Sequence, residues 1–284
     1  MKLLSGKVVA DQMKDTLRFE VERLKAHGKG VHLAIIQVGN DNASSVYVKN
    51  KIKACEHVGI DSTIIRLPEA VTEDALLLAV KKLNEDDTVD GILVQLPLPA
   101  HINESLVLST ISPDKDADGF HAINAGNLMI GNDCIVPCTP AGIMTLLSYY
   151  NINVEGKECV VVGRSNIVGK PTAMLMLHND ATVTICHSKT KELKDICKKA
   201  DILVCAIGKP KFFTSEYVKC GAIVVDVGIH RQEDGSLCGD VDFESVKNKA
   251  SAITPVPGGV GVMTVTMLMY NCLKLAASRF NRNQ

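Results

Sequence analysis

The sequence has almost no excess of charge of either sign, because its 284 residues carry 31 Lys and Arg against 32 Asp and Glu. The formal net charge is -1 and the pI is about 6.7. Proteins that bind nucleic acid or an anionic membrane surface usually carry a basic excess. We therefore expect neither nucleic acid nor a membrane among the partners, although a local anion site is compatible with this balance.

The sequence also has no long uncharged apolar run, and we expect no secretory leader. No window approaches the ~18 consecutive apolar residues that a bilayer-spanning helix needs. Residues 1–14 have no apolar core, because Lys7, Asp11 and Lys14 interrupt them. The prediction is a cytoplasmic protein.

The ten cysteines form neither a metal-binding nor a disulfide pattern. No CxxC pair occurs, and the closest two, Cys134 and Cys138, are four residues apart. Cys159, Cys186 and Cys205 lie inside apolar, strand-like runs, where a free thiol behaves as a small hydrophobic side chain. The prediction is a set of free structural thiols in a reducing compartment, with no bound metal.

The chain is long enough for two domains of ~150 residues each, and short apolar runs alternate with helical patterns along it. This alternation is typical of βα units on a mainly parallel sheet. Strands are predicted at residues 31–38, 62–67, 91–96, 158–162, 181–186, 202–207 and 222–227. Helices are predicted at 9–26, 46–58, 72–83, 142–150, 191–199, 215–219 and 263–278. The Pro-, Asp- and Gly-rich stretch 113–140 predicts the passage between the domains.

A glycine-rich turn follows the predicted strand 158–162. Its sequence, GRSNIVG at residues 163–169, stands between that strand and a helix, where backbone N–H groups and the helix dipole favour an anion. The spacing differs from the usual GxGxxG, so the motif alone also fits a tight turn without a ligand. Its place in a βαβ unit favours a dinucleotide site.

The end of the next strand favours NADP over NAD as the cofactor. Sites that prefer NAD usually end this strand with an acidic residue that holds the ribose 2′-hydroxyl. Here the strand 181–186 is followed by His187, Ser188 and Lys189, without a carboxylate. Arg164, in the turn, offers a planar guanidinium that suits phosphate.

Tyr47 and Lys51 are four residues apart and share one face of a predicted helix, with Ser44 or Ser45 as its N-cap. A Tyr-x-x-x-Lys pair also marks short-chain dehydrogenases, but there the glycine-rich loop precedes the pair, whereas here it follows. The pattern fits a solvated lysine-rich face as well as a catalytic site. A catalytic lysine needs a lowered pKa, which burial can supply.

Two further segments carry polar side chains next to an apolar strand. Gln95 ends the strand 91–96, at the edge where open α/β sheets bind ligands, although it also suits a structural role in the loop backbone. Residues 114–119, DKDADG, imitate a calcium loop, but Ala125 stands where that loop needs a glutamate. This turn can instead bond a ligand or its own backbone.

Taken in order, these segments resemble the bifunctional methylenetetrahydrofolate dehydrogenase/methenyltetrahydrofolate cyclohydrolase family of one-carbon metabolism. The resemblance runs from Gly6 to about Ala277. Its motifs are YVKNK at 47–51, GILVQLPLP at 91–99, DKDADG at 114–119, PCTP at 137–140, VVGRSNIVG at 161–169, HSK at 187–189 and TPVPGGVG at 254–261. One departure is Val262, where the family has proline, which predicts a less rigid loop.

The resemblance implies a role for each candidate residue. Lys51 would activate water and help to orient the folate, and Gln95 would position Lys51. Tyr47 would stack on the folate, and Asp118 would accept from the amino edge of the pterin. The other residues implied in the folate site are Gly261 and Thr264. The residues implied in the NADP site are Gly163, Arg164, Ser165, Gly169, Ser188 and Ile229, with Arg164 and Ser188 on the 2′-phosphate.

The sequence thus predicts an α/β protein of two domains with an interdomain cleft. Residues 1–139, with the C-terminal helix 264–284 packed on them, would form the folate-binding catalytic domain, and residues 140–263 a Rossmann-like NADP domain. The activity implied is oxidation of 5,10-methylenetetrahydrofolate and hydrolysis of the methenyl product, by a homodimer acting on tetrahydrofolate derivatives. A monofunctional dehydrogenase of the same fold and a non-catalytic NADP sensor are the alternatives.

Overall fold

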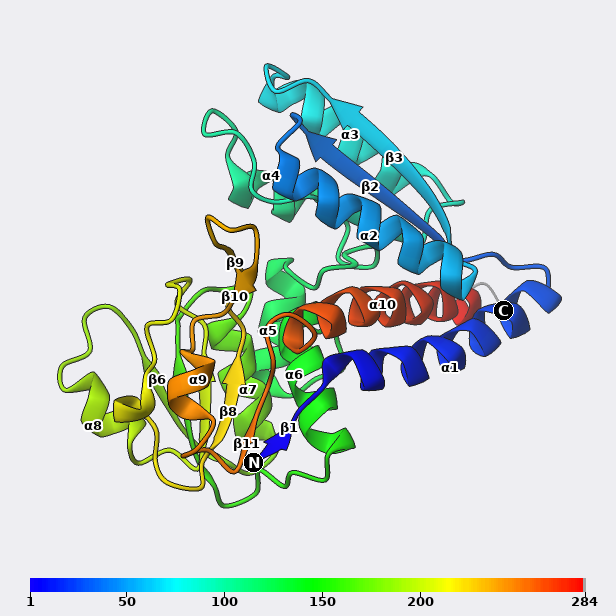
Figure 1. The fold of residues 1–284 in the computed structure, drawn as a ribbon. Coiled ribbons are helices and arrows are strands. Elements are labelled where there is room, and N and C mark those ends of the chain that lie inside the picture. The colour runs from blue at the N-terminus through cyan, green and yellow to red at the C-terminus, as the bar shows by residue number, and fades with distance from the viewer. Residues whose placement is uncertain (283–284) are drawn as a thin grey trace. The chain divides into compact units, whose positions relative to one another are not determined.

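The computed structural model describes residues 1–282, with the backbone alone for residues 42–43 and 281–282. The chain divides into two compact units, Met1–Asp11 with Pro137–Thr264, and Gln12–Val136 with Val265–Gln284 (Figure 1). The helices α1 (Gly6–Ala26) and α10 (Val260–Arg282) each contribute residues to both units. The last two residues of the predicted C-terminal helix lie outside the described residues. The domain limits and the interdomain cleft predicted from the sequence stay predictions.

The unit around residues 137–264 is built on a six-stranded parallel sheet of order β1-β11-β8-β7-β5-β6. Its strands are β1 (Lys2–Leu3), β5 (Glu158–Val162), β6 (Thr182–Cys186), β7 (Ile202–Cys205), β8 (Ile223–Asp226) and β11 (Ala252–Ile253). Its other helices are α6 (Cys138–Tyr149), α7 (Gly169–His178), α8 (Leu193–Cys197), the 3-10 helix η1 (Ser215–Tyr217) and α9 (Phe243–Val246). A small antiparallel ribbon adds β9 (His230–Arg231) and β10 (Leu237–Cys238).

The two faces of this sheet bury different sets of side chains. Alternate residues of β5 and β7 form one buried cluster with Phe213 and with residues of α8 and α9. Side chains alternate along a strand, so the residues between them point to the opposite face. That face is covered by α7, which contacts β5 and β6. Burial on both faces explains why β5 and β7 read as continuous apolar runs.

The unit around residues 12–136 has a three-stranded parallel sheet of order β3-β2-β4, in which β2 and β3 lie side by side in Figure 1. Its strands are β2 (His32–Val38), β3 (Asp61–Leu67) and β4 (Gly91–Val94). Its helices are α2 (Asn42–Val58), α3 (Glu73–Glu85), α4 (Glu104–Thr110) and α5 (Ala122–Ile130). Alternate residues of β2 and β4 pack with α3 and α4 in one buried cluster.

One helix of the described residues, Val260–Phe280, is long and apolar enough to cross a membrane by length and composition alone. In the 18-residue apolar stretch of this helix that meets the test, 56% is buried inside the structure. A helix buried in the core of a protein without membrane spans passes the same test. The burial of α10 is therefore sufficient to explain its apolar character. Met263, Met269 and Cys272 are all fully buried.

The seven predicted strands are confirmed, with ends that shift by at most two residues. The predicted helices are confirmed too, except that 215–219 is only a three-residue 3-10 helix. No helix was predicted in the passage 113–140, so α5, at Ala122–Ile130, was missed. Glycines and asparagines within and after α5 hide its periodicity. The other missed elements, α4, α9, β1, β9, β10 and β11, have two to seven residues each, too few to show a period.

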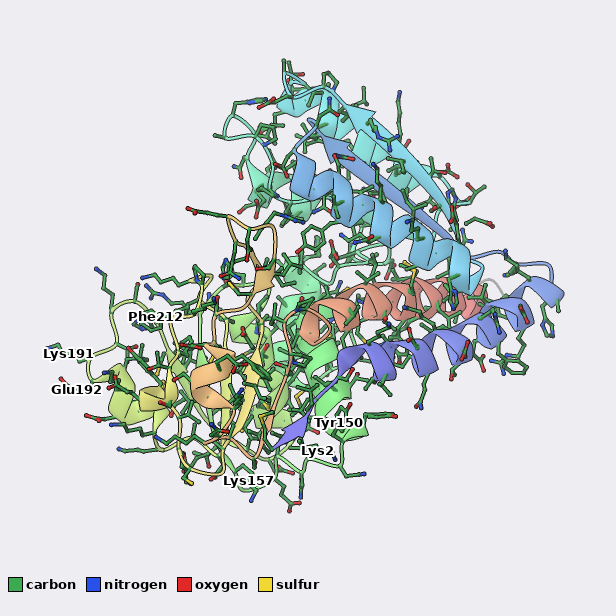
Figure 2. The ribbon with its side chains drawn as sticks, viewed as in Figure 1. Lys2, Tyr150, Lys157, Lys191, Glu192 and Phe212 are labelled. Carbon is green, nitrogen blue, oxygen red and sulfur yellow. The ribbon has the colours of Figure 1, made fainter. Side chains whose placement is uncertain are left out.

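The N-terminal residues belong to the six-stranded sheet through contacts that no sequence pattern shows. Lys2 and Leu3 pair with Ala252 and Ile253 of β11. Figure 2 shows Lys2 beside Tyr150, with Nζ 4.9 Å from the centre of the ring and 3.2 Å from the carbonyl oxygen. These contacts tie the first strand to the end of α6.

Nine of the ten thiols are buried and Cys220 is exposed. Burial raises the pKa of Cys55, Cys159 and Cys197 to about 12, so these carry almost no reactive thiolate near neutral pH. We expect one thiol to react rapidly with a chromogenic disulfide reagent in the native protein, and all ten after unfolding. The Cys220→Ser variant should lose the rapid phase. Several native thiols reacting at similar rates would contradict this burial pattern.

Candidate active site

Lys51 and Gln95 form a hydrogen-bonded pair at the carboxyl end of β4. Lys51 Nζ donates to Gln95 Oε1 at 3.0 Å, and both side chains are half-buried. Gln95 Nε2 donates to the carbonyl of Leu96 at 2.6 Å, and its backbone N–H donates to the carbonyl of Ile36 at 2.9 Å. The backbone of Gln95 is thus bound to β2 and the nitrogen of its side-chain amide to Leu96. The amide oxygen therefore faces the amine of Lys51.

The helix α2 presents Lys51 and Tyr47 on one face, one turn apart. Tyr47 is 40% exposed, so its ring is accessible to a ligand. The neighbours Lys49 and Lys53 are exposed. The solvated lysine-rich face therefore describes those two residues and not Lys51.

The start of α2 differs from its prediction. Ser44 or Ser45 was expected as the N-cap, and this is wrong, because the side chain of Asp41 accepts from the backbone N–H of Ser44 at 2.7 Å. A carboxylate three residues earlier can reach the same orphan donors, so the helix begins sooner. Ser45 instead accepts from Nε2 of the buried Gln37, at 3.0 Å.

Asp118 lies in a turn that runs beside β4. Ile92 and Asp116 form a parallel bridge, so the segment that leads to Asp118 and the strand that leads to Gln95 proceed toward the same edge of the sheet. The parallel direction places Asp118 and Gln95 at the carboxyl edge of the sheet, where the amine of Lys51 also lies.

The DKDADG turn bonds its own backbone, one of the two alternatives that the sequence offered, and it does so through the buried carboxylate of Asp116. Asp116 is 2% exposed, and its oxygens accept from the backbone N–H of Gly119, the backbone N–H of His121 and Nδ2 of Asn124, at 2.8 to 3.1 Å. Asn271 of α10 donates to the carbonyl of Ala117 at 2.9 Å. Within DKDADG, Asp116 therefore has a structural role, and its burial is what identifies that role.

The turn after β5 brings the chain too close to its neighbours for any side chain at its glycines. A Cβ at Gly163, where φ is +142°, would lie 2.3 Å from the carbonyl oxygen of Ala206, and a Cβ at Gly169 would lie 2.2 Å from the carbonyl oxygen of Gly163. The hydroxyl of Ser165 accepts from the backbone N–H groups of Val168 and Gly169 at 3.1 and 3.3 Å. The helix α7 then begins at Gly169.

These features fit a dinucleotide. Glycines let the backbone approach a pyrophosphate, and the N-terminus of the ten-residue α7 favours its charge. β5 lies between β6 and β7, so the turn stands at the point where the strand order reverses. Arg164 and Ser188 are both exposed, on the turns that follow β5 and β6. The three residues that directly follow β6, His187, Ser188 and Lys189, include no carboxylate.

Ile229 and Gly261, assigned to different ligands by resemblance, lie together. A Cβ at Gly261 would stand 2.6 Å from Cδ1 of Ile229, so the glycine is needed for this approach. Thr264 shares a hydrogen bond of 2.9 Å with the hydroxyl of Thr139, which sequence analysis did not single out. Val262 lies inside the first turn of α10, so the segment expected as a loop of reduced rigidity is helical.

Two buried aspartates stand at the carboxyl end of β8, and neither was singled out from the sequence. Asp226 accepts from the backbone N–H groups of Gly228, Asp240 and Val241, at 2.9 to 3.0 Å. A Cβ at Gly239 would lie 1.8 Å from Asp226 Oδ2, and one at Gly228 would lie 2.3 Å from Asp240 Oδ1. The two glycines therefore make room for the two carboxylates.

Two family profiles cover most of the chain. The catalytic domain of tetrahydrofolate dehydrogenase/cyclohydrolase matches residues 4–118, and its NAD(P)-binding domain matches residues 137–280. The bifunctional protein FolD of Agathobacter rectalis is 60% identical over 272 residues, 96% of this chain and 98% of that protein. The chain belongs to the tetrahydrofolate dehydrogenase/cyclohydrolase family.

Solved structures of the family agree closely with this fold. The bifunctional FolD enzyme of Campylobacter jejuni has a TM-score of 0.97 at 50% identity and covers 98% of this chain and 99% of its own. The Trypanosoma brucei methylenetetrahydrofolate dehydrogenase-cyclohydrolase, complexed with NADP cofactor and inhibitor, has a TM-score of 0.93 at 39% identity, with 97% of each chain covered.

Membership of the tetrahydrofolate dehydrogenase/cyclohydrolase family confirms several predictions at once. The resemblance, the two-domain α/β fold, the enzyme class and the presence of an NAD(P)-binding domain are confirmed. The roles of the individual residues stay predictions. Among residues 1–282, His, Cys, Asp and Glu side chains form no group of three that could hold a metal ion.

The pKa of Asp226 predicts a pH dependence of stability. Burial raises this pKa from 3.8 to about 6, against its backbone hydrogen bonds, which lower it. Between these pH values the folded protein keeps a proton that the unfolded chain has lost, so the contribution of Asp226 to the free energy of unfolding falls as pH rises. Relative to Asp226→Asn, the wild type should lose about 3 kcal/mol across this range.

Urea unfolding of both proteins between pH 4 and 7 measures this loss. The Asp242→Asn variant is the control, because Asp242 only caps α9. Parallel pH profiles for the wild type and Asp226→Asn would contradict the raised pKa, since they would mean that the hydrogen bonds cancel the effect of burial.

Proposed function

We propose that this protein oxidises 5,10-methylenetetrahydrofolate to the 5,10-methenyl form with NADP and then hydrolyses the methenyl form to 10-formyltetrahydrofolate. The observation that carries the proposal is the Lys51–Gln95 pair. It is an oriented amine in the part of the chain that matches the family's catalytic domain. The other unit supplies a turn that fits a dinucleotide. An oriented amine and a dinucleotide site are the two components that a hydrolysis and a hydride transfer require.

Lys51 would act at the bridging carbon of the folate. In the hydrolysis, water adds to the methenyl carbon and loses one proton, which gives a neutral carbinol. The bond from this carbon to one ring nitrogen then breaks as that nitrogen gains a proton and the carbinol hydroxyl loses its own, so that the formyl group forms and one proton is released overall. A lysine amine next to the carbon can take and return such a proton. Gln95 would hold the amine in place for both transfers, since its oxygen is directed at Nζ.

The remaining residues predicted for the folate site would orient the substrate. Tyr47, with its exposed ring one turn before Lys51, suits stacking on the folate. Asp118 is a carboxylate at the same sheet edge, and carboxylates bind the paired N–H donors of an amino-pyrimidine edge well. Gly261 and Thr264 are proposed as further folate contacts.

The dinucleotide turn would hold NADP, which accepts the hydride when it is bound. Gly163, Ser165 and Gly169 would bring the backbone to the pyrophosphate, and Ile229 would contribute an apolar contact. Arg164 and Ser188 would bind the 2′-phosphate, because both are exposed and the three residues directly after β6 include no carboxylate to repel it. Tetrahydrofolate derivatives as substrates, a homodimeric state and a cytoplasmic location belong to the same proposal.

Replacing Lys51 tests the hydrolysis. The Lys51→Met variant keeps much of the apolar stem and removes the amine, so hydrolysis of methenyltetrahydrofolate should fall by roughly 10²–10⁴-fold. The decay of methenyl absorbance, measured without NADP, reports this rate. Lys49→Met is the matched control, since Lys49 is an exposed lysine of the same helix, and it should hydrolyse at the wild-type rate. Intact hydrolysis by Lys51→Met would refute the assignment.

Replacing Arg164 tests the cofactor preference. The guanidinium is expected to bind the 2′-phosphate, so Arg164→Ala should raise the KM for NADP roughly 10- to 100-fold. NAD lacks this phosphate and provides the control within the same protein, because its KM should change little. Formation of NADPH and NADH is followed at fixed methylenetetrahydrofolate. Equal increases for both cofactors would remove Arg164 from the 2′-phosphate site.

A further inference from the structure

The segment that follows β7 forms one side of the candidate dinucleotide site. The carbonyl of Ala206 approaches Gly163 so closely that a Cβ there would lie 2.3 Å from it. The backbone N–H of Ala206 donates to the carbonyl of Val162 at 2.8 Å. Residues 207–209 therefore leave the sheet next to the glycine turn, at the point where the strand order reverses and ligands bind.

A single buried carboxylate binds the backbone of these three residues. Asp240 is fully buried. Its Oδ2 accepts from the N–H groups of Ile207 and Gly208 at 2.6 and 3.0 Å, and its Oδ1 accepts from the N–H of Lys209 at 2.9 Å. Three consecutive N–H groups thus point at one side chain, which fixes the path of the segment 207–209.

His230 completes the environment of this carboxylate. Its Nε2 lies 2.8 Å from Asp240 Oδ1, and the residue stands in β9 of the ribbon, drawn in gold and orange in Figure 1. The backbone N–H of Asp240 itself donates to Asp226. Asp240 is therefore anchored through its backbone to Asp226, while its two side-chain oxygens face three backbone N–H groups and the ring nitrogen of His230.

The direction of the N–H groups decides the direction of the carbonyls. In a trans peptide the N–H of one residue and the C=O of the residue before it point in opposite directions. The N–H groups of Gly208 and Lys209 point at Asp240, so the carbonyls of Ile207 and Gly208 point away from it. The carbonyl of Ala206, related in the same way to the N–H of Ile207, does point toward Gly163.

We propose that Asp240 and His230 are positioning residues for the cofactor, which hold residues 207–209 so that their carbonyls accept hydrogen bonds from the hydroxyl or amide donors of a bound dinucleotide. This inference rests on the proposed NADP site and adds to it a part that acts without touching the reacting atoms. It concerns cofactor binding alone, and the hydrolysis of methenyltetrahydrofolate does not use it.

The test compares NADP binding with hydrolysis in Asp240→Asn. Asparagine replaces one acceptor oxygen by an amide donor that faces N–H groups, so the segment must move. The Kd for NADP, measured by calorimetry without folate, should rise roughly tenfold or more, while hydrolysis without NADP stays within about twofold of the wild type. Asp242→Asn, the same change two residues away, should leave both values unchanged. An unchanged Kd, or a parallel loss of hydrolysis, would overturn the inference.

Two variants of His230 keep the test decisive if Asp240→Asn does not fold. His230→Gln places an amide donor close to the position of Nε2 and should bind NADP like the wild type. His230→Leu removes one of four donors and should raise the Kd for NADP by a few-fold. Equal Kd values for the two variants would overturn the inference. A wild type that binds no NADP would instead refute the proposed function.

Discussion

Parallel strand pairing is the constraint on which both candidate sites depend. In the six-stranded and the three-stranded sheet every pair of neighbouring strands runs parallel, so the segments after the strands emerge at one edge. At the small sheet this edge collects Gln95, the turn of Asp118 and the amine of Lys51. At the large sheet it collects the glycine turn after β5, the segment after β7 and the aspartate that ends β8. Residues far apart in sequence become neighbours for this geometric reason alone.

Buried carboxylates then hold the irregular segments at these edges. Asp116, Asp226 and Asp240 each accept several N–H donors from loops that have no sheet partner, which removes the cost of burying those donors. Glycines beside Asp226 and Asp240 are needed because a side chain would occupy the space of the carboxylate oxygens. Each carboxylate thus fixes the path of the loop around it, and well-defined positions of the loop residues are what binding and proton transfer both require.

The helices and strands that could be predicted from the sequence are those long enough to show a repeating pattern. The apolar runs of β2, β5 and β7 and the long helices α1, α2 and α10 were identifiable because each repeats its period several times. The ribbon of β9 and β10 was not, because two-residue strands show no alternation. The candidate residues Lys51, Gln95 and Arg164 could be named from motifs. The structural roles of Asp116 and Asp240 could not be predicted, because they depend on burial, and a buried and an exposed aspartate look the same in a sequence.

The sequence by itself determined the fold class, the family and the identities of the candidate residues, since these depend on patterns and motifs that persist along the chain. Only the tertiary structure decided that Lys51 is half-buried on Gln95 while Lys49 is exposed. It also decided that Asp240 orders a segment thirty residues earlier in the chain. Hydrogen bonds across such separations are set by how strands and loops pack, and no local pattern of residues encodes the distance between two atoms.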